Sequence, residues 1–225
     1  MIPAPATKVT EGCKKGRFIT LEGGEGVGKS TQGRLLAAEL ANRHGVEVVL
    51  TREPGGCPLA EKIRELVVTG PPGGLGARAE LLLMLAARAE HWRERIRPAL
   101  DRGAWVVCDR FHDSTLAYQG YGRGLDLDWI RQLGQFVLEG EKPDLTLLLM
   151  LPVTTGLERA TSGRGTPRGL RFEQESLAFH QRIVAGFATM AEREPERFRV
   201  IEATGSVTEV FSRISRVVHD RFWSD

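Results

Sequence analysis

One stretch of eight residues, with a strand pattern before it and a helix pattern after it, constrains this chain more than any other feature. It reads Gly-Gly-Glu-Gly-Val-Gly-Lys-Ser over residues 23–30 and fits the pattern G-x-x-x-x-G-K-[ST]. The apolar run 18–22 is typical of a β-strand, and residues 30–40 are typical of an α-helix. The amide groups of such a loop and the N-terminus of its helix face phosphates. The stretch therefore predicts a phosphate-binding strand–loop–helix unit.

The polar residues of this loop have separate expected roles. We expect Lys29 to reach the outer phosphates and the hydroxyl of Ser30 to ligate Mg²⁺. The loop alone leaves open whether the phosphate is transferred to water or to a second substrate. Glu25 is unexpected in a loop that binds anions, and its presence requires an explanation.

Short β-rich runs alternate with helical patterns along most of the chain. Five such runs separated by helices predict an α/β fold with a five-stranded, mainly parallel sheet covered by helices on both faces. The runs read RFITLE, VEVVLT, WVVCD, DLTLLLML and RFRVIEA. Polar segments rich in Gly and Arg follow them, and ligands of such sheets bind beyond the carboxyl ends of the strands. We expect one domain over residues 17–225 and a flexible N-terminal tail over residues 1–16.

The composition excludes several classes of protein. The net charge of +2 comes from 31 basic and 29 acidic residues, which is too balanced for a nucleic-acid-binding surface. The three cysteines have no C-x-x-C spacing, which argues against a disulfide framework or a zinc site. No apolar run is long enough to cross a membrane, and the leader lacks the apolar core of a signal peptide. We therefore expect a cytoplasmic protein without a nucleic-acid or membrane partner.

Two further segments carry residues that suit phosphate chemistry. Asp109 ends the run WVVCD and is expected to support Mg²⁺ through a water molecule, with Arg110 pointing into the same crevice. A local turn with a salt bridge is the alternative for this pair. A polar segment contains Arg159, Arg164, Arg168 and Arg171. We expect residues from about 160 to 173 to form a mobile lid that brings at least one arginine to the transferred phosphoryl group, the alternative being a solvated charged face.

Several motifs, in their order and spacing, resemble the bacterial thymidylate kinase family. They are GGEGVGKST, TREPGG, AELLLMLAARAEH, VVCDRFHDSTLAYQGYGRG, PDLTLLLMLP, GLERA, RFEQES and EATG. The resemblance covers about residues 17–222. It implies a three-layer P-loop kinase fold, Mg²⁺-assisted transfer of the γ-phosphoryl group of ATP to dTMP, and a homodimer. A kinase for another acceptor such as dUMP, or a P-loop ATPase or switch without an acceptor, is the alternative.

The resemblance also implies a role for each matching residue. Those implied to bind ATP are Gly23, Gly24, Glu25, Gly26, Val27, Gly28, Lys29, Ser30, Thr31 and, against the adenine, Arg159. Those implied to bind dTMP are Arg52, Glu53, Pro54, Met84, Arg88, Arg110, Ser114, Thr115, Tyr118 and Gln119. Those implied to act in the transfer itself are Lys29, Glu25, Arg110, Arg164, Arg168 and Arg171.

Some of these implied roles are specific. Arg52 and Arg110 resemble the clamps on the dTMP phosphate, and Arg88 resembles the residue that hydrogen-bonds the thymine edge. Glu25 resembles the carboxylate that faces the 3′-hydroxyl of the acceptor, and Tyr118 the ring that crowds the 2′ position. Gly26 matches the bacterial branch, in which the lid carries the arginines and the loop carries none.

The chain departs from the family pattern at two methionines. Met84 stands where members commonly have a phenylalanine that stacks on thymine, and Met150 where they often have an aspartate. Stacking of a base on an aromatic ring is worth about 1–3 kcal/mol, and sulfur–aromatic contact about 0.3–1.5 kcal/mol. We therefore expect weaker binding of the acceptor base at Met84 and a core-filling role for Met150.

Overall fold

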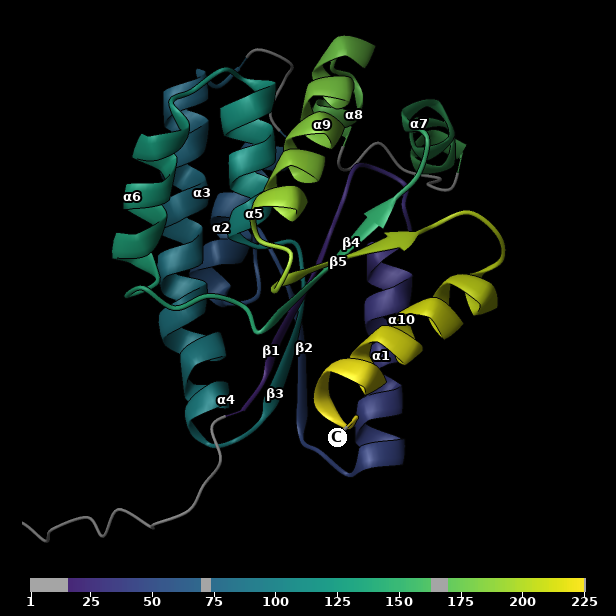
Figure 1. The fold of residues 1–225 in the computed structure, drawn as a ribbon. Helices are drawn as coiled ribbons and strands as arrows, with labels where there is room; N and C mark the ends of the chain where they lie inside the picture. Colours follow the sequence, from purple (N-terminus) through teal and green to yellow (C-terminus); the bar gives the residue numbers. More distant parts are fainter. Residues whose placement is uncertain (1–15, 70–73, 163–169, 225) are drawn as a thin grey trace, which may run out of the picture.

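A five-stranded parallel sheet forms the centre of the molecule (Figure 1). The computed structural model describes residues 16–69, 74–162 and 170–224. The strands are β1 (Phe18–Glu22), β2 (Val48–Arg52), β3 (Trp105–Asp109), β4 (Leu145–Met150) and β5 (Phe198–Glu202). Their order in the sheet is β2-β3-β1-β4-β5, and every neighbouring pair is parallel. The predicted α/β architecture with five parallel strands is thus confirmed.

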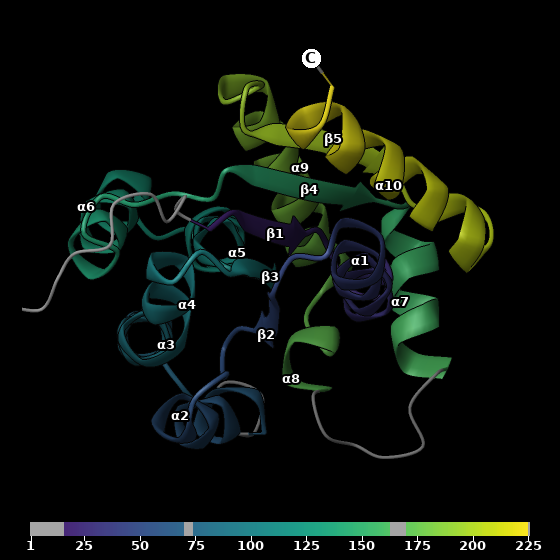
Figure 2. The ribbon, with the colours of Figure 1, turned by 90° about the horizontal axis from the view of Figure 1, so that it is seen from below.

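Helices cover both faces of this sheet, as the turned view shows (Figure 2). They are α1 (Lys29–His44), α2 (Pro58–Val68), α3 (Ala77–His91), α4 (Arg97–Asp101), α5 (His112–Thr115), α6 (Leu127–Val137), α7 (Val153–Ser162), α8 (Leu170–Glu173), α9 (Leu177–Arg193) and α10 (Val207–Phe222). Two π-helical segments, η1 (Trp92–Ile96) and η2 (Leu116–Gly122), continue α3 and α5. No helix among the described residues is both long and apolar enough to cross a membrane.

Alternate residues of each strand belong to different hydrophobic clusters, because successive side chains of a strand point to opposite faces. Ile19 and Leu21 of β1 pack with Leu36 of α1 and Ile214 of α10. Phe18 lies on the other face, in a second cluster. A third cluster on that face contains Leu148 of β4 and residues of α3, α6 and α9. The central strand β1 is buried along its whole length, as expected for a parallel strand covered on both sides.

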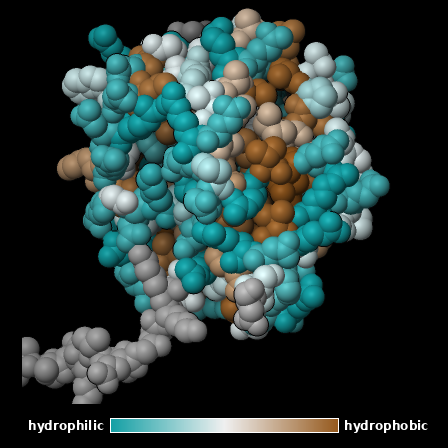
Figure 3. All heavy atoms as spheres, viewed as in Figure 1, coloured by the Kyte–Doolittle hydropathy of each residue, from teal (hydrophilic) through white to brown (hydrophobic). Residues whose placement is uncertain are grey.

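The edge strand β5 is less covered than the central strands. Its Val200 is 60% exposed. Figure 3 shows a mostly hydrophilic surface with an apolar band over the part of the sheet where β4 and β5 lie in Figure 1.

Strand register places the candidate functional residues at one edge of the sheet. Asp109 is the register partner of both Leu21 in β1 and Arg52 in β2. The phosphate loop, residues 23–28, therefore begins next to the ends of β2 and β3. Carboxyl ends of parallel strands are where ligands of this architecture bind.

Candidate active site

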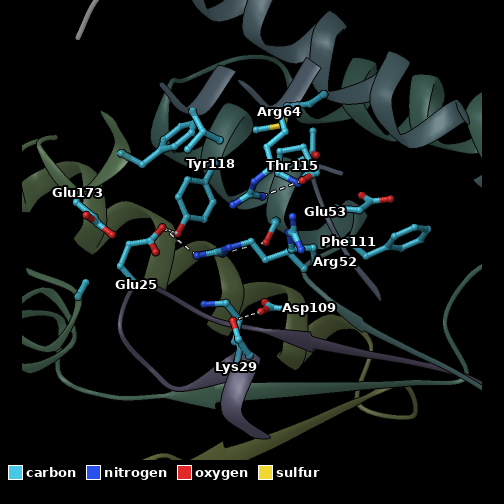
Figure 4. Close-up of a pocket in the computed structure, with 18 of the residues that line it drawn as sticks. Glu25, Lys29, Arg52, Glu53, Arg64, Asp109, Phe111, Thr115, Tyr118 and Glu173 are labelled. Atoms are coloured by element: carbon cyan, nitrogen blue, oxygen red, sulfur yellow. Dashed lines mark hydrogen bonds and ion pairs between the residues drawn. The ribbon is translucent and has the colours of Figure 1, made fainter. Parts of the chain in front are cut away.

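A cavity of about 430 Å³ lies at this carboxyl edge of the sheet. The phosphate loop and α1 form one wall, and residues of α2, α3 and the segment after β3 form the opposite wall. Figure 4 shows Lys29 and Glu25 on the loop side, with Arg52, Arg64 and Thr115 across the cavity. The cavity thus connects the predicted donor loop with the predicted acceptor residues.

The phosphate loop leads directly into α1. Gly28 precedes the helix with φ 94°, a left-handed conformation that glycine adopts without steric cost. The ammonium of Lys29 donates to the carbonyl oxygens of Gly24, at 2.6 Å, and Gly23, at 3.2 Å. Burial, and then the charge of Arg110, lower the pKa of Lys29 to about 8. A bound phosphate would replace these carbonyl partners and favour the charged amine.

Two oxygen donors suited to Mg²⁺ stand beside the lysine. The hydroxyl of Ser30 donates to the carboxylate of Asp109 at 2.5 Å, and both residues line the cavity. A hydroxyl and a carboxylate are the hard donors that Mg²⁺ takes, together with water and substrate phosphates. Among the described residues no cluster of three His, Cys, Asp or Glu side chains forms a cage for a metal. The donor set fits a magnesium ion that is held mainly by nucleotide phosphates.

Arg110 lies at the centre of the site and has an unusual backbone conformation. Its φ of 67° lies in the left-handed region, which side chains other than glycine rarely adopt. Its guanidinium donates to Gly23 O at 3.0 Å, to Ser114 Oγ at 3.2 Å and to Glu25 Oε1 at 2.9 Å. It also lies over the ring of Tyr118, 4.9 Å from its centroid. Strain of this kind is retained where surrounding contacts impose it, often at functional sites.

Glu25, the unexpected carboxylate of the loop, pairs with these groups. The hydroxyl of Tyr118 donates to Glu25 Oε1 at 2.7 Å, on the same oxygen that accepts from Arg110. Burial alone would raise the pKa of Glu25, but Arg110, Lys29 and the Tyr118 hydroxyl outweigh burial and lower the pKa to about 2. Glu25 is therefore an anion throughout the physiological pH range.

A second carboxylate supports the turn that carries Arg110. Glu22 ends β1 and is fully buried, with Oε1 accepting from the Phe111 amide at 2.8 Å and Oε2 from the Ser114 hydroxyl at 2.6 Å. Burial and the nearby Asp113 raise the pKa of Glu22 to about 8. Glu22 thus ties the strand before the phosphate loop to the turn after β3.

Arg88 lies on the acceptor side within a buried hydrogen-bond network. Its side chain is 3% exposed, and it donates to Glu53 at 2.7 Å and to the Phe111 carbonyl at 3.1 Å. The other carboxylate oxygen of Glu53 lies 3.0 Å from His91, which also contacts Thr51. The Glu53 carboxylate is therefore engaged in orienting Arg88. Arg52, in contrast, is half exposed and pairs with Glu61 on α2.

Most residues that the sequence singled out line this one cavity. They are Glu25, Gly26, Gly28, Lys29, Ser30, Thr31, Arg52, Glu53, Pro54, Met84, Arg88, Asp109, Arg110, Ser114, Thr115, Tyr118, Gln119 and Arg159. Gly23, Gly24 and Val27 belong to the loop but are not part of the lining. Arg164 and Arg168 lie outside the described residues.

One predicted residue lies elsewhere. Arg171 was expected among the arginines that reach the phosphoryl group, but it is buried away from the cavity lining. Its guanidinium pairs with Glu80 at 2.7 Å and donates to the carbonyl oxygens of Val67 and Leu75. These contacts fix α8 against α2 and α3, so the structure does not bring Arg171 to the cavity, and its catalytic role stays a prediction.

Sequence reasoning missed several lining residues. They are Arg64, Val68, Phe111, Ala160, Phe172 and Glu173. For two of them a signal was present, because Arg64 and Val68 are four residues apart and share one face of α2. Arg64 donates to Pro54 O at 2.8 Å, and burial followed by the nearby Arg52 lowers its pKa. Four arginines thus line the acceptor side, namely Arg52, Arg64, Arg88 and Arg110.

This arrangement defines a class of protein. A glycine-rich loop between β1 and α1, with a lysine and a serine–aspartate pair at the carboxyl edge of a parallel sheet, is the nucleotide-phosphate site of a P-loop kinase fold. The arginine-lined half of the same cavity provides a place for an anionic acceptor.

Comparisons with known proteins identify the family within this class. The family model described as thymidylate kinase matches residues 21–214, and the chain belongs to that family. It is 55% identical to a thymidylate kinase of Magnetococcus marinus over 209 residues, which cover 93% of this chain and 98% of that protein. It is 51% identical to a thymidylate kinase of Syntrophotalea carbinolica, over 88% of this chain and 92% of the relative.

A solved structure also resembles this fold. The crystal structure of thymidylate kinase from Ehrlichia chaffeensis superimposes with a TM-score of 0.74 at 35% sequence identity. The match covers 91% of this chain and 99% of that chain.

Proposed function

We propose that this enzyme transfers the γ-phosphoryl group of ATP to dTMP and so makes dTDP, a precursor for DNA synthesis. The observation that carries the proposal is the single cavity, which has the phosphate loop on one side and four arginines on the other. A hydrolase or a switch needs no second anion site. Family membership supports thymidine monophosphate as the acceptor.

On the donor side, the loop amides and Lys29 bind the ATP phosphates, and Arg159 lies against the adenine. Ser30 and, through water, Asp109 would hold Mg²⁺, which would supply positive charge against the charge that develops on the phosphoryl group. Arg164 and Arg168, which lie outside the described residues, are proposed to bring further positive charge to that group. An arginine in this role is worth about 10³–10⁵ in rate.

On the acceptor side, Arg52, Arg64 and Arg110 hold the dTMP phosphate, and Arg88 donates to the thymine edge. Glu25 faces the 3′-hydroxyl of the sugar, and its negative charge orients this hydroxyl as a hydrogen-bond donor. The acceptor phosphate oxygen is already anionic, so positioning and electrostatic stabilisation supply the acceleration without a general base.

A coupled ADP-release assay with dTMP, dUMP, dCMP and dGMP as acceptors tests this function. We expect turnover with dTMP to exceed that with each other nucleotide and to require Mg²⁺. A preference for dUMP would mean that dUMP, and not dTMP, is the acceptor. ATP turnover that is equal with and without any acceptor would exclude the kinase proposal.

We further propose that the enzyme is a cytoplasmic homodimer. The neighbouring helices α2, α3 and α6 carry large exposed apolar side chains, namely Leu66, Leu82, Trp129 and Phe136, the last 83% exposed. An apolar face of this kind suits a second copy of the chain. Light scattering should give the dimer mass for the natural chain and a lower mass for a Phe136→Asp variant. A monomeric natural chain would contradict the proposal.

A further inference from the structure

The phosphate loop and α7 touch through their backbones at two facing glycines. A β-carbon added at Gly26 would lie 1.9 Å from the carbonyl oxygen of Gly156. A β-carbon added at Gly156 would lie 2.5 Å from the carbonyl oxygen of Glu25. Real β-carbons do not approach other atoms below about 3.0 Å. Neither position therefore has room for a side chain while loop and helix stay in place.

The helix itself does not require glycine at position 156. Gly156 lies in the first turn of α7, where its amide donates to Pro152 O at 3.0 Å as in any helix. Glycine in a helix interior is less stable than alanine by about 1 kcal/mol. Local stability would therefore favour alanine, and it is the contact with the loop that excludes it.

The contact connects two parts of the site. Arg159 and Ala160 follow on the same helix and line the cavity. On the loop side lies Glu25, whose carboxylate binds Arg110 and Tyr118. A displacement at Gly156 acts directly on the backbone that carries this carboxylate.

We propose that Gly156 is a positioning residue for phosphoryl transfer: its missing side chain lets α7 pack on the phosphate loop and thereby fixes the Glu25 carboxylate toward the acceptor. The inference rests on the proposed dTMP kinase activity. Restoring an ordinary contact of 3.4 Å from 2.5 Å would displace the helix or the loop by about 0.9 Å. A misplacement of about 1 Å can cost about 10²-fold in rate.

The test is the Gly156→Ala variant, with Gly33→Ala as the matched control. Gly33 is also a buried helical glycine, but a β-carbon there would have its nearest neighbour at an ordinary 3.6 Å, on the Leu50 side chain. We expect Gly156→Ala to lower kcat by about 10- to 100-fold. We expect the KM for dTMP to stay within about threefold, because three of the four acceptor arginines lie on β2, α2 and α3, outside the loop and α7. The melting temperature should not fall, and the control should leave the kinetics unchanged.

Several outcomes would overturn the inference. These are an unchanged kcat, a rise in the KM for ATP alone, or a variant that fails to fold or melts well below the natural enzyme. In a Glu25→Gln background, Gly156→Ala should cost less than about threefold, because the carboxylate that it misplaces is absent. Equal losses in both backgrounds would refute a role through Glu25. If the natural enzyme does not use dTMP, the proposed function fails instead, so the two failures are distinguishable.

Discussion

Arg110 contacts both halves of the site, so its replacement by alanine should perturb donor and acceptor binding together. The guanidinium contacts Gly23, Glu25, Ser114 and the ring of Tyr118. In the proposed complex it donates two hydrogen bonds to the dTMP phosphate. Hydrogen bonds to charged groups contribute about 1.5–3 kcal/mol each. The variant should therefore lose about 3–6 kcal/mol, or about 10²- to 10⁴-fold in kcat/KM for dTMP.

The same substitution should also change the pH dependence. Arg110 is the strongest of the groups that lower the pKa of Glu25, and burial, which raises it, remains in the variant. The pKa of Glu25 therefore rises in Arg110→Ala. Because Glu25 acts as an anion, the residual activity should increase with pH in the acidic range, where the natural enzyme shows no titration of this group.

The assay is coupled ADP release at saturating ATP and Mg²⁺, with dTMP varied at several pH values. Arg93→Ala is a suitable control, because Arg93 is 65% exposed and, within the described part of the chain, pairs with Glu90 and Glu94 on the surface. Exposed pairs contribute about 0–1 kcal/mol, so this variant should behave like the natural enzyme. A kcat/KM for Arg110→Ala within about threefold of the natural value would refute the clamp role.

Two further predictions concern the base and the buried carboxylate. Met84 lines the acceptor half, so Met84→Phe should lower the KM for dTMP by up to about tenfold through stacking, and an unchanged KM would mean that the side chain does not contact thymine. Glu22 has a pKa of about 8 in the folded protein, raised from an ordinary value of 4.5. Folding therefore favours the protonated carboxyl, and the free energy of unfolding decreases as pH rises from 4.5 to 8. The melting temperature of Glu22→Gln should fall less over this range than that of the natural enzyme; parallel curves would exclude the linkage.

Parts of the site that depend on short-range pattern could be predicted from the sequence. Lys29 and Ser30 follow from the loop motif, since strand, loop and helix are contiguous in the chain. Asp109 and Arg110 follow from their position after an apolar run, because parallel strands end at a common edge. The five strands and their parallel arrangement follow from the same alternation of patterns.

Other parts depend on contacts between distant segments and could not be predicted. Arg171 looked like a free arginine in a polar segment, but Glu80, 91 positions earlier, is its partner. The raised pKa of Glu22 depends on its burial and then on Asp113, which the fold brings near the end of β1. Phe172 enters the cavity lining because α8 packs beside α2 and α7, a placement that no local pattern encodes.

The facing glycines of the loop and α7 also bear on how such sequences can diverge. The alternative to arginines in a polar segment is an arginine in the loop itself, at the position of Gly26. In this chain the Gly156 carbonyl occupies the space of the first side-chain atom at that position. A single codon change at position 26 would thus meet the helix before it could supply a new charge. Loop and helix must therefore change together to pass from one arrangement to the other. A series of single substitutions at position 26 alone does not connect them.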